Sequence, residues 1–138
     1  MTRRTTNLIA AACAALCALI FMLAAAATSA PGWLDSDRYL LAHATFAAAF
    51  GAAVTSWMMF PHLARRSGAR GLLRDMAIIA LAVFIASLLA GTLVLPGPGT
   101  AGGPMFVISS LGATPALGLI LAVGAIAAIA LSRNSRRE

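Results

Sequence analysis

The sequence predicts an all-α integral membrane protein, a bundle of four transmembrane helices with both termini in the cytoplasm. Three observations predict this fold: the composition, the length of the uncharged runs and the placement of the arginines. Of the 138 residues, 61% are hydrophobic and 10% are charged, and the mean hydropathy is +0.92. Soluble domains carry about 25% charged residues, so this chain has too few charges to cover a water-facing surface. We expect one transmembrane domain that comprises residues 1–138.

Long runs without charge mark the segments that are expected to cross the membrane. A hydrocarbon core of about 30 Å requires roughly 20 helical residues. Two runs of this length predict spans at about 8–28 and 39–60. The longest uncharged run contains three prolines and four glycines at 96–104, and such a segment should interrupt a helix. That run therefore predicts a third and a fourth span, at about 74–95 and 107–131.

The first span also has features of a secretory signal peptide. Two arginines precede it, and a short stretch of small residues follows it. The apolar part of a signal peptide is about 7–15 residues long, whereas the uncharged run from Leu8 to Ala27 comprises 20 residues. We therefore expect a retained transmembrane helix.

The start of the fourth span has two interpretations. Either one tilted helix begins near Met105 and is kinked at Pro115, or the crossing helix begins at Pro115 with Thr114 as its N-terminal cap. In the second case, residues 105–113 would lie along the outer interface. We expect the kinked helix.

The arginines predict the orientation of the chain. All ten cationic residues are arginines, and nine of them lie in clusters at 3–4, 65–74 and 133–137. The cytoplasmic flanks of transmembrane helices carry an excess of Arg and Lys. This rule places both termini and the 61–73 loop in the cytoplasm, with the other two loops outside, in a multi-pass protein of a cytoplasmic (inner) membrane.

The arginine cluster between the second and third spans is the candidate surface for contact with lipid or a partner. Near an anionic membrane surface, each such residue contributes about 1 kcal/mol of attraction. The net charge of +6 does not predict nucleic-acid binding, because the charges mark membrane borders and form no continuous basic face. The residues of this cluster are Arg65, Arg66, Arg70 and Arg74.

The predicted spans hold few residues that carry chemistry. The uncharged runs contain no Asp, Glu, Lys, Arg, Asn or Gln, whereas proton- and cation-coupled transporters place an ionisable side chain near the bilayer midplane. His43 is the one histidine inside a run. It is a candidate ligand for haem b or for a quinone oxygen. We favour a structural role for it, as a hydrogen-bond partner of a neighbouring helix or of headgroup water, and expect no cofactor.

Cys13 and Cys17 are four residues apart and therefore lie on one face of the first helix. This pattern is compatible with a soft-metal or redox site. Side chains at this helical spacing diverge, which disfavours a disulfide between them. Buried cysteines usually behave as small hydrophobic residues, and we expect that role for both and no metal site.

These observations predict a protein without a catalytic site of its own. We expect an interaction or accessory subunit of a membrane assembly, with the lipid bilayer and other membrane subunits or a second copy as partners. Small residues four apart in each span, such as Ala47 and Gly51, favour close helix packing. One alternative is a haem- or quinone-linked anchor that uses His43. The other is a channel or carrier for small uncharged solutes lined by Thr45, Ser87, Thr92, Ser109 and Ser110.

Overall fold

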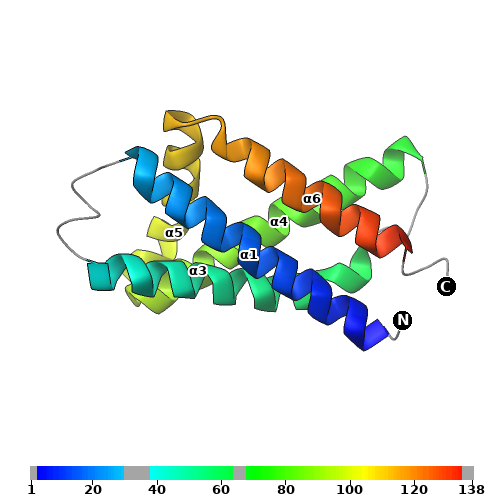
Figure 1. Ribbon diagram of the computed structural model, residues 1–138, viewed down its shortest axis with the longest axis horizontal. Coiled ribbons are helices and arrows are strands. Elements are labelled where there is room, and N and C mark those ends of the chain that lie inside the picture. Colours follow the sequence, from blue (N-terminus) through cyan, green and yellow to red (C-terminus); the bar gives the residue numbers. More distant parts are fainter. Residues whose placement is uncertain (1–2, 30–37, 64–67, 135–138) are drawn as a thin grey trace.

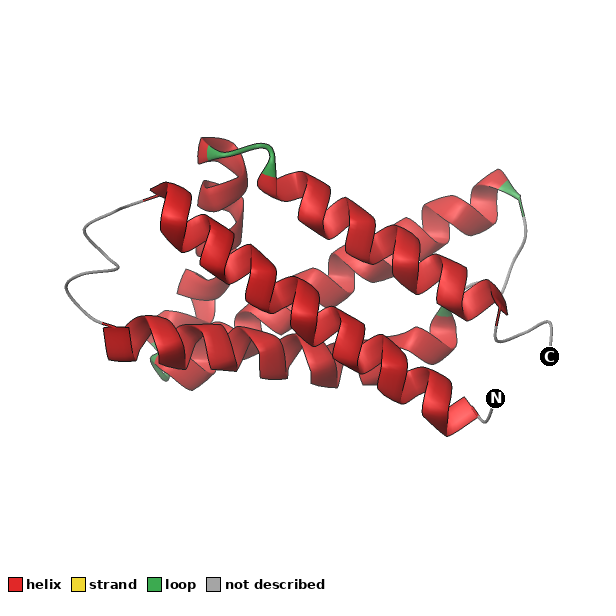
Figure 2. Cartoon of the chain, in the orientation of Figure 1, coloured by secondary structure: helices red, strands yellow, loops and turns green. Residues whose placement is uncertain are grey.

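The computed structural model describes residues 3–29, 38–63 and 68–134, and these residues are almost entirely helical (Figure 2). Four helices are long and apolar enough to span a membrane. They are α1 (Arg3–Ser29), α3 (Arg38–Met59), α4 (Ala69–Val94) and α6 (Leu117–Asn134). A short 3-10 helix, η1 (Phe60–His62), follows α3, and a shorter α-helix, α5 (Pro98–Ala113), connects α4 to α6.

The helices pack in an open chain of neighbours. α1 lies between α3 and α6, α3 packs against α4, and α4 packs against α5, whereas α4 and α6 touch at few positions. Figure 1 shows the start of α1, the end of α6 and the start of α4 at one end of the bundle, which we call the inner end. The end of α1, the start of α3 and the whole of α5 lie at the opposite, outer end. The first residue of α1 and the last residue of α6 are therefore at the same end of the bundle.

Small residues mediate the closest helix contacts, as the spacing predicts. A Cβ atom on Gly51 of α3 would lie 2.8 Å from the carbonyl oxygen of Ala86 in α4. A Cβ atom on Gly124 of α6 would lie 3.1 Å from the sulfur of Cys17 in α1. Glycine at these positions lets the backbones approach one another, which is how transmembrane helices associate without a hydrophobic driving force.

The prediction of a single kinked fourth helix is wrong. Thr114 has extended backbone angles (φ −137°, ψ 83°) and ends α5, and the crossing helix begins at Leu117 instead of near residue 107. The cause is local: a residue that precedes proline is disfavoured in the α region, so Thr114 cannot continue the helix into Pro115. The other interpretation, a new start at Thr114–Pro115, is close to the observed break.

The predicted interruption of the long uncharged run at 96–104 is confirmed, but the break is shorter than predicted and most of the segment is helical. The chain leaves α4 at Leu95 and reverses at Gly97, whose φ of +88° favours glycine. α5 then begins at Pro98, a favourable first helical residue, and continues through Pro104. The helix tolerates its glycines and this internal proline because Gly99 and Gly103 pack directly on the backbone of α4.

The third helix also begins earlier than predicted. α4 starts at Ala69 and not near residue 74, so part of the expected 61–73 loop is helical. Asp75 therefore lies in the second turn of the helix, and it is the most completely buried large side chain among the described residues. The first three predicted spans are otherwise confirmed as helices of transmembrane length.

Candidate functional site

The outer half of the bundle contains a large cavity. It has a volume of about 650 Å³ and is lined by residues of α1, α3, α4, α5 and the start of α6. The walls are mostly alanine, glycine, leucine, valine and phenylalanine. A cluster of buried apolar side chains, Phe21, Ala25 and Leu117, packs beside it. The cavity is therefore a predominantly apolar space between the helices.

The polar groups of this outer cavity are three serines, Ser87, Ser109 and Ser110. The Ser87 hydroxyl donates a hydrogen bond to the Phe84 carbonyl oxygen of its own helix (2.7 Å). Ser110 is 3% exposed, and Ser109 is exposed. Because the Ser87 hydroxyl already donates its hydrogen within its own helix, the serines of α5 are the better candidates to donate a hydrogen bond into the cavity.

A second, smaller cavity lies toward the inner end. It has a volume of about 130 Å³, and Val83 and Leu121 line both cavities and separate them. Phe60 of η1 and Leu63 close its inner end in a buried apolar cluster with Ala10. The interior therefore consists of two apolar spaces in sequence along the bundle.

Both cysteines line the smaller cavity as free thiols. Cys17 lies against Gly124 of α6, where the small residue makes room for the sulfur. The thiols are thus packed among alanines and aliphatic side chains at the junction of α1 and α6, an environment in which cysteine acts as a small apolar residue. Both are half-buried, and their role as small apolar residues stays a prediction.

The five hydroxyl residues predicted to line a solute path do not all line one cavity. Thr45 donates to the Leu41 carbonyl oxygen of its own helix (2.7 Å). Thr92 donates to the carbonyl oxygen of Leu88 (2.8 Å), and its hydroxyl lies 2.9 Å from that of Thr100, at an exposed position. Of the five predicted residues, the three serines line the outer cavity and the two threonines do not.

His43 lies on the exposed side of α3 and lines neither cavity. Its Nε2 atom is 3.4 Å from the carbonyl oxygen of Leu93 in α4, a long contact between neighbouring helices of the kind expected for a structural role. Within residues 3–29, 38–63 and 68–134, no three side chains of His, Cys, Asp or Glu come together. Its role as a ligand of haem or of a quinone stays a prediction.

The arginine cluster is only partly described, because Arg65 and Arg66 lie outside the described residues. Arg70 is exposed and Arg74 is half-buried, both in the first two turns of α4. Arg133 in the last turn of α6 is exposed too. These side chains therefore all belong to the inner end of the bundle (Figure 1).

Asp75 is a buried polar residue that the sequence analysis did not identify. It is 1% exposed, and the inner ends of two other helices also bury a hydroxyl residue, Thr6 in α1 and Ser132 in α6. A signal for its burial exists in the sequence. Asp75 follows Gly71 by four residues and precedes Ile78 and Ile79 by three and four, so it shares the inward face of α4 with them.

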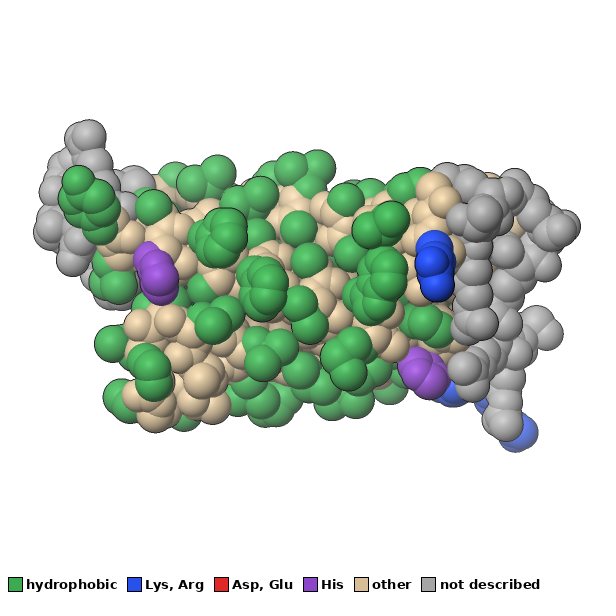
Figure 3. Space-filling view, turned by 90° about the horizontal axis from the view of Figure 1, so that it is seen from below, with side chains coloured by type: hydrophobic (Ala, Val, Ile, Leu, Met, Phe, Trp, Pro, Cys, Tyr) green, Lys and Arg blue, Asp and Glu red, His purple; other side chains and the backbone are tan. Residues whose placement is uncertain are grey.

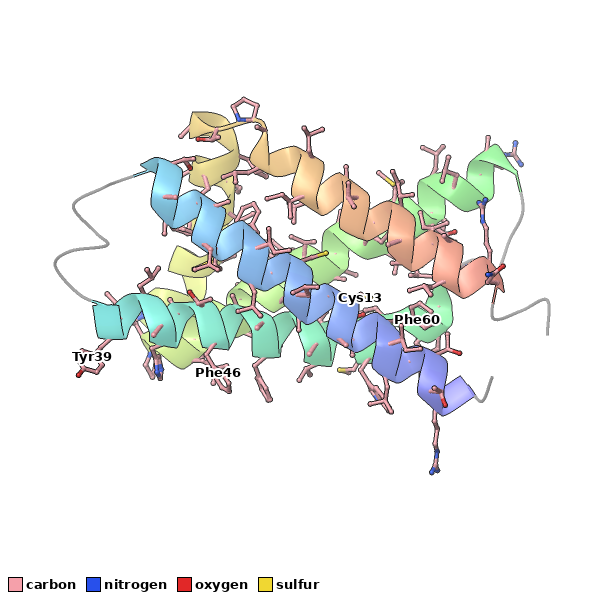
Figure 4. All side chains as sticks on the ribbon, in the orientation of Figure 1. Cys13, Tyr39, Phe46 and Phe60 are labelled. Carbon is pink, nitrogen blue, oxygen red and sulfur yellow. The ribbon has the colours of Figure 1, made fainter. Side chains whose placement is uncertain are left out.

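An aromatic face on α3 is the second feature that the sequence analysis missed. Four aromatic side chains at spacings of seven, four and seven point away from the bundle and are 90%, 72%, 53% and 42% exposed. Figure 4 shows two of them, Tyr39 and Phe46, directed outward. Hydrophobic side chains gather along this side of the molecule in Figure 3. We define the α3 face by Tyr39, Phe46, Phe50 and Trp57.

The comparisons with known proteins yield no relative. No family model matches the chain, and neither a curated protein nor a solved structure matches it.

Proposed function

We propose that this protein is an accessory subunit of a membrane assembly, without a catalytic site of its own, and that the α3 face packs against a transmembrane helix of another subunit. The observation that carries the proposal is the concentration of exposed aromatic side chains on one helix. Elsewhere in the described residues, Phe84 is the one aromatic side chain among the large exposed apolar residues, and the rest are aliphatic or methionine.

The geometry of the α3 face supports a helix as its partner. Spacings of four and seven residues place side chains along one seam at the heptad repeat that helix pairs use. Aromatic side chains are large and lose little rotational freedom on binding, and interfaces concentrate their binding energy in such residues. Lipid contact alone requires no such repeat, since any apolar side chain satisfies it.

A photocrosslinking experiment tests the α3 face. A benzophenone side chain replaces Phe50 in the full-length protein, and membranes are irradiated before solubilisation. We expect an adduct that mass spectrometry maps to a transmembrane helix of a second polypeptide. Additional replacement of Phe46 with Ala should lower its yield at least about fivefold, because a central interface anchor is lost.

The matched control carries the same photoreactive group at Phe84 of α4, which is equally exposed but lies outside the α3 face. It should react with lipid and give no protein adduct. An adduct to a second copy of this chain would identify the partner as a homo-oligomer. Equal protein adducts from both positions, or none from Phe50, would contradict the proposal.

We place the inner end of the bundle in the cytoplasm of a cell bounded by a cytoplasmic membrane. The arginines of the 65–74 cluster, together with Arg133, support this orientation through the positive-inside rule. In this position, Arg65, Arg66, Arg70 and Arg74 contact anionic headgroups, each with about 1 kcal/mol of attraction.

Reporter fusions test the orientation. A reporter that is active only in the cytoplasm, fused in turn to the first and last residues, should be active at both ends. A fusion within the 31–37 loop should be inactive. Activity at one terminus and not at the other would exclude the paired arrangement of the ends and would overturn the assignment.

A further inference from the structure

We propose that the outer cavity binds one acyl chain of a membrane phospholipid and that the Ser110 hydroxyl donates a hydrogen bond to the ester carbonyl oxygen of that chain. The cavity volume of about 650 Å³ falls within the range of about 300–1,000 Å³ that small-molecule sites occupy. Its composition has the usual form of such sites, with apolar walls and a few polar groups that fix the orientation of the ligand.

The depth of the cavity matches one leaflet of a bilayer. Its lining residues extend from Val83 to Leu95 on α4 and from Leu40 to Ala52 on α3. Each stretch rises by twelve residues, about 18 Å along a helix. One leaflet contributes about half of the roughly 30 Å hydrocarbon core. A chain that enters from the outer end can therefore run through the cavity beside the lipids of the same leaflet.

The walls favour a hydrocarbon chain over water. Alanines and glycines dominate the lining on α3, α4 and α5, and a buried water needs two to four polar partners. An empty apolar space forfeits the dispersion contacts of all the atoms that line it. A flexible chain restores these contacts without requiring any hydrogen bond from the walls.

The buried position of Ser110 indicates that the ligand carries a hydrogen-bond acceptor. Its side chain is almost completely buried and lines the cavity. A serine hydroxyl can donate one hydrogen bond, and Ser110 is only 3% exposed. Burying a hydroxyl without a partner is costly, so an acceptor in the cavity stabilises the complex. Figure 1 shows α5 crossing the outer end of the bundle. In the orientation proposed above, this end faces the headgroups of the outer leaflet.

The test uses the full-length protein in nanodiscs with phosphatidylethanolamine that carries a diazirine in its palmitoyl chain. After irradiation, we expect labelled peptides from the cavity walls of α4 and α5. Replacing Ala48 with Phe fills the cavity from α3 and should lower this labelling at least about fivefold. The control is Ala42→Phe on the exposed side of the same helix, which should leave the labelling within about twofold of the original chain.

A second variant tests the hydrogen bond and leaves the cavity volume nearly unchanged. The unsubstituted protein should bind the ester-linked probe about two- to tenfold more tightly than its ether-linked analogue, which is the contribution of one net hydrogen bond. Ser110→Ala should abolish this preference and retain the labelling by the ether-linked probe. Ser110→Ala and Ala48→Phe should both keep the helical circular dichroism signal of the original protein.

Three results would overturn the proposal. Undiminished labelling of the cavity walls in Ala48→Phe would show that the probe reports only annular lipid. Equal binding of the ester and ether probes by the original chain would exclude the role of Ser110. Displacement of the probe by a prenyl quinone, with no displacement by unlabelled phosphatidylethanolamine, would assign the cavity to a quinone.

Discussion

Replacing Gly103 with alanine is expected to lower the free energy of unfolding by about 2–3 kcal/mol. A Cβ atom at this position would collide with the backbone carbonyl of Ser87 in α4, 2.8 Å from its carbon atom, and would lie 3.2 Å from the backbone nitrogen of Gly91. Backbone atoms cannot move aside as a flexible side chain can, so α5 must separate from α4. Alanine's higher helix propensity, worth about 1 kcal/mol, offsets only part of this cost.

The matched control is the neighbouring Gly102→Ala, because a Cβ atom on Gly102 meets nothing within 4 Å. This variant should be as stable as the original chain or slightly more stable, since alanine restricts the unfolded state. Unfolding in mixed micelles of mild detergent and dodecyl sulfate, followed by circular dichroism, measures both. Equal stability of Gly103→Ala and the original chain would show that α5 does not pack on α4 through this contact.

The number of helices long and apolar enough to span a membrane could be predicted because it depends on average properties of long segments. A span of about 20 apolar residues averages over many side chains, so an error at one position moves a boundary by little. Single prolines and glycines are harder to interpret. Thr114 and Pro115 end a helix because of one local steric restriction, whereas Pro104 stays inside a helix because α4 supports its glycine-rich neighbours.

The candidate sites depend on which helices become neighbours, and the patterns in the sequence do not reveal those neighbours. The two cavities are bounded by helices that are distant in the chain. α5, which lines the larger one, was expected to be a loop in its first part and the start of the fourth span from residue 107 onward. The partners of single hydroxyls are equally hard to predict. Those of Thr45 and Thr55 both donate to carbonyl oxygens of their own helix. The α3 face, by contrast, follows from spacing alone and was open to prediction from the heptad repeat of Tyr39, Phe46 and Phe50.

Asp75→Ala is expected to lower the free energy of unfolding by about 1–3 kcal/mol, the cost of leaving buried polar groups without their partner. Asp75 is 1% exposed, and the residue takes part in an interaction with its surroundings. It lies one turn before Ile78 and Ile79, which pack against the buried cluster at the inner end. The loss should therefore loosen the contact between α4 and the rest of that end. Denaturation in mixed micelles measures the change.

Asp75→Asn separates the effect of the negative charge from that of a hydrogen-bond acceptor. Asp75→Asn keeps the size and one acceptor oxygen, so it should be closer in stability to the original chain than Asp75→Ala if the interaction is a hydrogen bond. If the negative charge is required, the asparagine variant should be as unstable as the alanine variant, because a buried partner charge is left uncompensated. Met76→Ala is the control, since this neighbouring side chain is half exposed and should change stability by no more than about 0.5 kcal/mol. An Asp75→Ala protein as stable as this control would show that the Asp75 side chain does not stabilise the inner end.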